Sequence, residues 1–460
     1  MAAPKSSIQR DLSGNSRLEM PIIKKVKCNG KDDYPQGSER QELEARFEDL
    51  IYEDLALGSQ VSYVGNRPIP FLRIYRYKEA FSLNFVNHFL AKFNANPSSD
   101  YVFDPFSGMG TTLFGSMLGK IPSVGIDRLP IAYFVSKTLP LFLTLKPHDL
   151  SRAWINLIPT VPRNIPAEIA SDVAIMKVAF DETTLLILRR LKSAICGLPP
   201  HLRDMLFLVF FSVLEDCSFT SKDGQFLRLE RDKKTSDPIK VMGKKIAQVE
   251  EDIRRMKLFY PNLSISKEVI PEVHLGDTRD LSDIQFKKSP TILITSPPYA
   301  NRYDYTRSYS LELCFHFVKD FEELKELRFG ILRSHIESKI AQNEKSPHPI
   351  VTEVLEALSK KELNNPKIPS MLTTYFIDMQ KVIREWHRVL APNAKVAMVV
   401  DNVRFEGELV PVDLILSDMA ETSGFKVKEV IVARYKGNSS QQMKKYGKVP
   451  VRESVVVWEK

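Results

Sequence analysis

Short apolar runs alternate along the chain with longer amphipathic stretches, a pattern typical of an α/β protein. Runs rich in β-branched residues predict buried strands at 101–103, 124–126, 273–277, 291–294 and 394–400, and a terminal strand pair at 427–433 and 454–458. Apolar residues at helical spacing predict helices at 41–57, 83–90, 113–118, 183–196, 202–214, 311–317, 376–390 and 414–423. The alternation predicts one sheet covered by helices.

The same patterns divide the chain into four parts. Residues 1–40 are polar and basic and predict a mobile N-terminal arm, whereas 41–138 and 272–460 hold the predicted strands. Residues 139–271 are mostly helical by their apolar spacing and predict an inserted helical region. The polar stretch 337–370 contains four prolines and predicts an excursion from the fold or a lid.

The composition is that of an ordinary globular protein, with 43% hydrophobic and 27% charged residues. A net charge of +8 permits a polyanionic partner but does not require one. Four cysteines lie far apart without a Cys-x-x-Cys pair, so neither a disulfide framework nor a zinc site is expected, and a reducing compartment fits. Met1–Arg17 lacks the apolar core of a secretory signal, and no apolar run predicts a membrane span.

One chemically distinctive stretch is Thr295–Tyr299, which reads Thr-Ser-Pro-Pro-Tyr directly after a predicted strand. Two successive prolines cannot donate hydrogen bonds to a sheet, so the strand ends there and continues as a stiff, extended loop. In that loop Ser296 and the backbone carbonyls can accept from an amine, and Tyr299 offers a flat aromatic face. The stretch suits a planar group with an exocyclic amino group, although a rigid turn would account for the prolines alone.

A second stretch is Asp104–Thr112, which reads Asp-Pro-Phe-Ser-Gly-Met-Gly-Thr-Thr between a predicted strand and a predicted helix. Its glycines let the backbone approach a ligand, and Asp127, after the next predicted strand, can accept from ribose hydroxyls. A dinucleotide site is the competing interpretation, but Thr-Thr follows Gly-x-Gly here and Asp104 would repel a pyrophosphate. A positively charged cofactor such as S-adenosylmethionine fits better.

Two basic segments, 218–245 and 436–448, are candidates for a surface that binds a polyanion. Both combine lysines with glutamine and aromatic residues, a composition that can meet phosphates and bases. A solvated charged loop explains the first segment equally well. The residues expected at nucleic-acid phosphates are Lys222, Arg228, Lys233, Lys234, Lys444 and Lys445.

Together the two motifs resemble those of the amino-group DNA methyltransferases of bacterial type, which methylate exocyclic nitrogens of cytosine or adenine. Asp104–Thr112 is similar to the family's S-adenosylmethionine motif, and Ser296–Tyr299 to its catalytic motif of Ser, Asp or Asn followed by Pro-Pro and an aromatic residue. Tyr77–Ser82 is similar to the segment before the cofactor loop. The resemblance implies a Rossmann-like S-adenosylmethionine-dependent methyltransferase sheet, mostly parallel with an antiparallel last strand, and a mainly helical insertion.

The resemblance also implies roles for individual residues. S-adenosylmethionine is the expected cofactor, held by Lys78, Phe103, Asp104, Pro105, Phe106, Ser107, Gly108, Gly110, Thr111, Thr112, Asp127 and Asp277. The catalytic residues would be Ser296, Pro297, Pro298 and Tyr299, acting on a base flipped out of the duplex. Tyr303 and Arg307 would contact the base or its phosphates, although a structural role fits them as well. The insertion 139–271 would contribute to target recognition.

The resemblance favours one reaction over several alternatives. Serine before Pro-Pro is commoner among cytosine-N4 enzymes, so we expect a site-specific DNA methyltransferase acting on N4 of cytosine. An adenine-N6 enzyme, an RNA base methyltransferase and an inactive DNA-binding subunit are the alternatives. Double-stranded DNA is the expected partner, with a separate cognate restriction endonuclease as a second candidate. The expected location is the bacterial cytoplasm at the nucleoid, with no metal and no membrane association.

Three other residues of chemical interest are expected to pack in the core. Transfer to cytosine C5 would need a cysteine nucleophile in a Pro-Cys motif, whereas Cys314 lies in an apolar predicted helix. His274 and His316 border apolar runs and are expected to be packed residues rather than catalytic bases.

Overall fold

A computed structural model of the chain describes residues 34–223, 226–261, 263–338, 344, 346–437, 445–447 and 449–460. Most of the predicted N-terminal arm lies outside the described residues, and so does Lys444.

Eight strands form one sheet in the order β1-β11-β12-β8-β7-β2-β3-β6. These strands are β1 (Ile51–Glu53), β2 (Val102–Asp104), β3 (Ser123–Asp127), β6 (Glu272–Leu275), β7 (Ile292–Thr295), β8 (Lys395–Asp401), β11 (Lys426–Lys436) and β12 (Val451–Glu459). Neighbouring strands are parallel except at β12, which runs antiparallel to both β11 and β8. This arrangement confirms the predicted Rossmann-like sheet with an antiparallel last strand.

The strand order places a crevice at the centre of the sheet. From β2 the chain moves outward through β3 to β6, and then returns to β7 on the other side of β2. The carboxyl ends of β2 and β7 are therefore neighbours at the point where the order reverses, which is where open α/β sheets bind ligands. The loops after these two strands are the two motifs found in the sequence, Asp104–Thr112 and Thr295–Tyr299.

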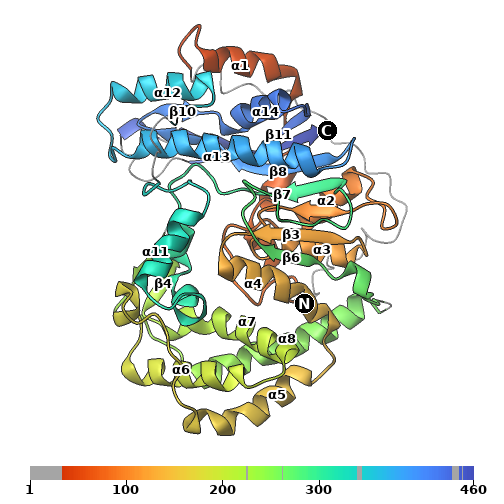
Figure 1. The fold of residues 1–460 in the computed structure, drawn as a ribbon, viewed down its shortest axis with the longest axis vertical. Helices are drawn as coiled ribbons and strands as arrows, with labels where there is room; N and C mark the ends of the chain where they lie inside the picture. The colour runs from red at the N-terminus through yellow and green to blue at the C-terminus, as the bar shows by residue number, and fades with distance from the viewer. Residues whose placement is uncertain are drawn as a thin grey trace, which may run out of the picture.

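Helices cover both faces of the sheet (Figure 1). Helix α2 (Leu83–Lys92) packs on one face beside α3 (Thr111–Leu118), and α13 (Ile368–Val389) lies with α14 (Val412–Thr422) on the other. Successive residues of β2 point to opposite faces, so Val102 joins the core under α2 while Phe103 joins the core under α13. Burial on both faces explains why the central strands are continuous apolar runs.

A helical region lies at the lower end of the molecule in Figure 1, away from β8 and β11. Its elements are α5 (Asp149–Leu157), α6 (Glu182–Cys196), α7 (Pro200–Cys217), α8 (Pro238–Phe259) and a hairpin of β4 (Thr220–Asp223) and β5 (Phe226–Leu229). Phe211 of α7 packs edge-on against Phe134 of α4 (Pro130–Thr138), with ring centroids 5.4 Å apart. Such contacts join the region to the cofactor half of the sheet in one apolar core.

The remaining elements are short or lie at the periphery. The helices are α1 (Glu39–Phe47), α9 (Tyr305–Ser308), α10 (Ser310–Glu312), α11 (Phe321–Gly330) and α12 (Pro349–Ser359), with a π-helical turn at Leu313–Phe317. A small antiparallel pair consists of β9 (Val403–Phe405) and β10 (Glu408–Val410). Short 3-10 turns lie at Glu48–Leu50, Leu55–Ser59, Tyr63–Asn66, Leu139–Thr144, Ile158–Arg163, Ala174–Lys177 and Lys267–Val269.

Two helix predictions are wrong in part. The predicted helix 41–57 ends as α1, and the chain then extends into β1 because Ile51–Glu53 gains a parallel partner in β11. The predicted helix 311–317 is α10 followed by the π-helical turn. Tertiary pairing and packing override local helical spacing at both places.

Two peripheral segments are more firmly packed than the sequence predicted. The polar stretch 337–370 includes α12, and Val351 and Val354 on that helix are buried in the core with α13. Near the predicted end of the arm, the Arg40 side chain is 1% exposed and pairs with Glu353 at 2.6 Å and Glu408 at 2.9 Å. Packing against the main domain therefore begins before residue 41.

Candidate active site

The loop between β2 and α3 forms one wall of the site. Gly108 and Gly110 have φ angles of 51° and 80°, in a region that L side chains rarely adopt. A Cβ at Gly108 would lie 3.3 Å from the ring of Tyr77, and a Cβ at Gly110 would lie 2.8 Å from Cα of Ser136. Both positions require glycine, and Tyr77 closes over the loop.

Asp127, at the end of β3, holds this loop in place. Its Oδ2 accepts from the backbone N–H of Gly108 and its Oδ1 from that of Leu129, both at 2.9 Å. Burial raises the pKa of Asp127 to about 6. Two backbone donors use only part of a carboxylate's accepting capacity, so Asp127 can also accept from ribose hydroxyls.

Asp104, at the end of β2, connects the cofactor loop to the catalytic loop. Its side chain is buried, and Oδ1 accepts from the hydroxyl of Thr295 at 2.7 Å and from the backbone N–H of Phe106 at 3.2 Å. Burial raises the pKa of Asp104 to about 7. The hydroxyl of Thr112, at the start of α3, donates to the carbonyl of Ile294 on the neighbouring strand β7 at 3.2 Å. The two motifs are thus joined by side-chain hydrogen bonds.

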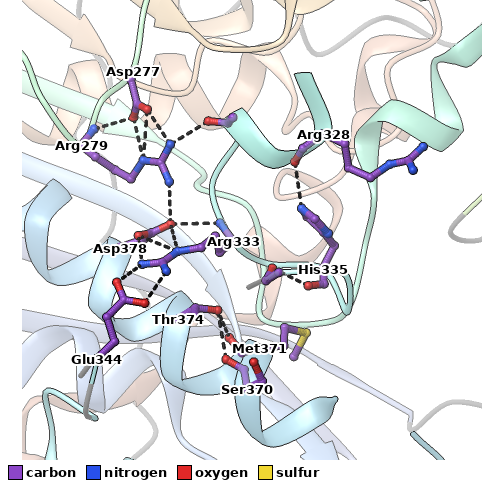
Figure 2. A network of polar contacts seen from close by, with 12 residues as sticks. Asp277, Arg279, Arg328, Arg333, His335, Glu344, Ser370, Met371, Thr374 and Asp378 are labelled. Carbon is purple, nitrogen blue, oxygen red and sulfur yellow. Dashed lines mark hydrogen bonds and ion pairs between the residues drawn. The ribbon is translucent and has the colours of Figure 1, made fainter. Parts of the chain in front are cut away.

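Asp277, which follows β6, belongs to a chain of ion pairs (Figure 2). Arg279 pairs with Asp277 at 2.6 Å and with Asp378 of α13 at 2.8 Å. Asp378 also pairs with Arg333 at 2.7 Å, and Arg333 pairs with Glu344 at 2.7 Å. Burial alone would raise the pKa of Asp277, but the hydrogen bonds and charge of Arg279 outweigh it and hold that pKa below its ordinary value. Asp277 is therefore an oriented carboxylate.

The loop after β7 brings the Ser-Pro-Pro-Tyr motif to the same edge of the sheet. The hydroxyl of Ser296 donates to the carbonyl of Val399 on β8 at 3.3 Å, and it lies 3.4 Å from the hydroxyl of Tyr299. The hydroxyl of Tyr299 donates to Oε1 of Glu453 at 3.1 Å. Since Ser296 donates to a backbone carbonyl, its oxygen can accept from an amine.

These loops surround a cavity of about 320 Å³. It is lined by Lys78, Asp104, Pro105, Phe106, Ser107, Gly108, Thr111, Asp127 and Asp277 from the predicted cofactor set, and by Ser296, Pro297, Pro298 and Tyr299. The buried acids suit a ligand with a sulfonium and an amino group, and Asp127 suits a ribose. The side chains present therefore fit S-adenosylmethionine.

Three residues predicted to bind the cofactor lie behind the cavity wall. Phe103 is fully buried, with its ring edge-on to Phe286 at 5.3 Å. Gly110 packs on Ser136, and Thr112 is fully buried in its hydrogen bond to Ile294. These residues pack inside the protein and do not line the cavity, a distinction that a sequence motif does not make.

Other residues line the cavity without having been assigned to it from the sequence. Among them are Tyr77, Glu79 and Phe81 before α2, Ile331 and Leu332 after α11, and Arg434, Lys436 and Glu453 from β11 and β12. The similarity of Tyr77–Ser82 to a family segment was a usable signal for the first group. The residues after α11 and those on β11 and β12 reach the cavity through packing between distant segments. No local sequence motif predicts that packing.

Two lysines expected at DNA phosphates are engaged inside the protein. Lys222 is 7% exposed, forms an ion pair with Glu312, and has its ammonium 4.4 Å from the ring centre of Tyr309. The ammonium of Lys233 donates to the carbonyls of Glu215 at 2.6 Å and Thr220 at 2.5 Å. The segment around them includes the two strands of the β4–β5 hairpin, and Lys233 donates to the carbonyl of Thr220 at the start of β4.

The other expected DNA contacts differ in exposure. Arg228 and Lys234 are exposed, and Lys445 is exposed and pairs with Glu406 at 2.8 Å. Arg307 is half-exposed and forms an ion pair with Glu337. Tyr303 is largely buried and lines the cavity.

Of the three residues expected in the core, Cys314 and the ring of His316 pack there, whereas His274 does so only in part. Cys314 is fully buried, and burial raises the pKa of its thiol to about 12. The ring of His316 lies 4.5 Å from that of Phe207, and burial lowers the pKa of the imidazole to about 4. His274 is half-buried on β6.

The described part of the chain holds neither a metal-binding cluster nor a membrane-spanning helix. No group of three or more His, Cys, Asp or Glu side chains there is placed to hold a metal ion. None of its helices is both long and apolar enough to cross a membrane.

The sheet order and the cavity between the glycine loop, its acids and the Ser-Pro-Pro-Tyr loop define an S-adenosylmethionine-dependent methyltransferase. The chain is 32% identical over 506 residues to the Type II methyltransferase M.BsoBI of Geobacillus stearothermophilus, covering 98% of this chain and 97% of that protein. It is 31% identical over 465 residues to M.AvaI of Nostoc sp. and of Anabaena variabilis, covering 91% of this chain and 92% of each relative. The chain therefore belongs to the Type II methyltransferases, bacterial site-specific DNA methyltransferases of restriction-modification systems, and S-adenosylmethionine is its methyl donor.

No family model matches the chain. Among solved structures it is similar to two of the rRNA methyltransferase AviRa from Streptomyces viridochromogenes. The TM-scores are 0.31 and 0.30 at 10% and 11% identity, with 83% of this chain and 86% and 85% of the other chains covered.

Proposed function

We propose that this methyltransferase transfers the methyl group of S-adenosylmethionine to the exocyclic N4 of cytosine within a specific DNA sequence. The observation that supports this proposal is the position of Ser296. Ser296 lines the cofactor cavity, and its hydroxyl donates to the carbonyl of Val399 and lies 3.4 Å from the hydroxyl of Tyr299. Serine at the first position of this motif favours cytosine. Transfer to adenine N6 by the same loop is the second candidate.

The reaction requires a base that has left the duplex, at a cost of a few kcal/mol. Tyr299 would stack on the flipped ring, a contact worth about 1–3 kcal/mol. The hydroxyl of Ser296 and the carbonyl of Pro297 would accept the two amino hydrogens, which turns the nitrogen lone pair toward the methyl group. The N–CH3 bond would form as the S–CH3 bond breaks and leaves a neutral thioether, and the methylated amine would then lose its extra proton to solvent water. Positioning therefore supplies most of the rate.

The identity of the product tests the proposal directly. DNA from cells that express the chain should contain N4-methylcytosine, measured by mass spectrometry of nucleosides, and DNA from cells expressing Ser296→Ala should contain far less. N6-methyladenine in place of N4-methylcytosine would establish the second candidate. Methylated nucleosides in the RNA fraction alone would establish an RNA methyltransferase, and their absence from both fractions would indicate an inactive subunit.

The aromatic residue of the motif gives a second prediction. Tyr299→Ala should keep wild-type affinity for S-adenosylmethionine in calorimetry, while methyl transfer falls by about ten- to a hundred-fold because the stacking contact is lost. Tyr299→Phe is the matched control, since it keeps the ring and removes only the hydroxyl, with its contacts to Ser296 and Glu453. Full turnover in Tyr299→Ala would show that the Pro-Pro loop is merely structural.

The partners follow from the same proposal. Double-stranded DNA of the bacterial cytoplasm would be the substrate, with exposed Arg228, Lys234, Lys445 and Arg307 as candidate phosphate contacts. A separate restriction endonuclease that cuts the same sequence would be the second partner. Sequencing of methylated DNA would give the recognition sequence, and that sequence should be resistant to the endonuclease only after methylation.

A further inference from the structure

A row of charged side chains crosses three strands beside the catalytic tyrosine. In the sheet register Arg434 of β11 is paired with Glu453 of β12, and Glu453 is paired with Asp401 of β8. Residues paired across neighbouring strands point to the same face of a sheet. Lys436, two residues beyond Arg434, points to that face as well. The four side chains therefore gather at the edge of the sheet where Ser296 and Tyr299 lie.

The hydrogen bonds within this row fix its geometry. Glu453 is 1% exposed, and its Oε1 accepts from the hydroxyl of Tyr299 at 3.1 Å and from the ammonium of Lys436 at 2.5 Å. Its Oε2 accepts from the guanidinium of Arg434. Oδ2 of Asp401 accepts from Lys436 at 3.1 Å. Two cations balance two acids, and Glu453 sets the orientation of the tyrosine.

Lys436 is the member of this row best placed to meet a ligand. It lines the cavity, and its ammonium lies 5.3 Å from the ring centre of Tyr299. An ammonium has three N–H donors. Two of them go to Asp401 and Glu453, and in the part of the chain that the structure describes no acceptor is recorded for the third.

The chemistry of the target base matches a cation at this position. A cytosine whose amino group is held by Ser296 and Pro297 presents two more polar atoms on the same edge, N3 and O2, and both are acceptors. Adenine presents N1 on that edge and then only a C–H. We propose that Lys436 recognises the acceptor edge of the flipped cytosine by donating its third N–H to O2 or N3. This inference rests on the proposed cytosine specificity, and it makes Lys436 a base contact rather than a phosphate contact.

The test separates a base-edge contact from the other roles that a lysine has at this position. Affinity is measured for three duplexes that differ only at the target nucleotide, which is cytosine, a nonpolar difluorobenzene isostere or an abasic site. S-adenosylhomocysteine is present to prevent turnover. In Lys436→Met the preference for cytosine over the isostere should fall by about ten- to a hundred-fold, the size expected of a hydrogen bond from a charged donor. Affinity for the isostere and the abasic duplex should stay near wild type.

Two other results would overturn the inference. An equal loss on all three duplexes would mean that Lys436 contacts the DNA backbone. An equal loss on the cytosine and isostere duplexes, with the abasic duplex unaffected, would mean that Lys436 acts only through the ring of Tyr299. Lys361→Met is the matched control, because Lys361 has 33% exposure against 31% for Lys436 and pairs with Glu408 at 2.5 Å. It should leave all three affinities unchanged.

A further variant and the product analysis keep the result interpretable. Lys436→Met leaves Asp401 and Glu453 with Arg434 as their one cation in this row. If that variant does not fold, Asp401→Asn combined with Lys436→Met restores the balance of charge. The double variant should show the same loss of preference for cytosine. N6-methyladenine as the wild-type product would overturn the cytosine proposal itself. N4-methylcytosine as the product, together with an unchanged cytosine preference in Lys436→Met, would overturn only the role of Lys436.

Discussion

At the scale of single residues, the cofactor loop depends on the absence of a side chain at Gly108. Its φ of 51° and the Tyr77 ring 3.3 Å from a built Cβ leave no room for a larger residue without strain. We expect Gly108→Leu to abolish binding of S-adenosylmethionine in calorimetry while circular dichroism shows the fold retained. Gly119→Ala is the control, since φ there is −74° and a Cβ meets its neighbours at 3.5 Å. Unchanged affinity in Gly108→Leu would place the cofactor elsewhere.

The buried acids of the site predict how cofactor binding depends on pH. Burial raises the pKa of Asp104 to about 7 and that of Asp127 to about 6, so both carry full charge only above these values. A positively charged donor is attracted by the ionised forms, so its dissociation constant should fall as the pH rises from about 5.5 to 8. Asp104→Asn should flatten this dependence near pH 7 in calorimetry at constant ionic strength. If the dissociation constant of Asp104→Asn changed with pH near 7 as steeply as that of the wild type, Asp104 would not be the group that attracts the cofactor.

The same pKa values have the opposite effect on the empty protein. Each folded-state pKa lies above the roughly 3.9 of an aspartate in an unfolded chain, so the folded state binds more protons between about pH 4 and 7. The contribution of these two groups to stability is therefore present at low pH and is lost as the pH rises through that window. The cofactor therefore binds to the ionised form of Asp104 and Asp127, whereas burial in the empty protein stabilises their protonated form.

At the scale of elements, α13 supports the cavity wall through Asp378. Figure 2 shows its carboxylate between Arg279, which orients Asp277, and Arg333, which follows the cavity residues Ile331 and Leu332. The side chain of Asp378 is 1% exposed, so its loss leaves two poorly hydrated guanidinium groups without their shared partner.

This arrangement gives a prediction about stability and binding together. Asp378→Ala should lower the free energy of unfolding by about 3–5 kcal/mol, as expected when one partner of a buried ion pair is removed. It should also weaken S-adenosylmethionine binding, because Asp277 and residues 331–332 lose their support. Arg388→Ala on the same helix is the control, since Arg388 is half-exposed and its pair with Glu385 is worth about 0–1 kcal/mol. Denaturant unfolding compares the variants, and equal losses in both would contradict a special role for Asp378.

At the scale of the whole molecule, the sheet edge with the active site faces elements of the helical region. The hairpin β4–β5 packs against α9, which follows the catalytic loop by only a few residues. The exposed basic residues after this hairpin, Arg231 and Lys234, are therefore candidates to hold DNA next to the site. Phosphate contacts of this kind release counterions and make affinity depend on salt.

The salt dependence of DNA binding tests this surface. Arg231→Ala combined with Lys234→Ala should flatten the slope of log affinity against log salt by up to about two units, with cofactor binding unchanged. Lys426→Ala combined with Lys428→Ala is the control, because these exposed lysines lie at the start of β11, at the opposite end of the sheet from the site. A wild-type slope in the first double variant would show that its lysine and arginine are only solvated surface.

The sequence alone determined the central strands, the cofactor loop, the Ser-Pro-Pro-Tyr loop and the kind of reaction. Each of these depends on the residues of short contiguous segments. Apolar runs mark buried strands, glycines permit a positive φ and paired prolines fix φ, and each of these effects acts within its own segment. Only the tertiary structure decided which polar groups meet. Glu453 reaches Tyr299 across 154 residues through strand register, and Lys222 is drawn inward by Glu312 across 90. Ion-pair partners and burial depend on which distant strands and helices become neighbours. The local sequence around a residue does not predict those neighbours.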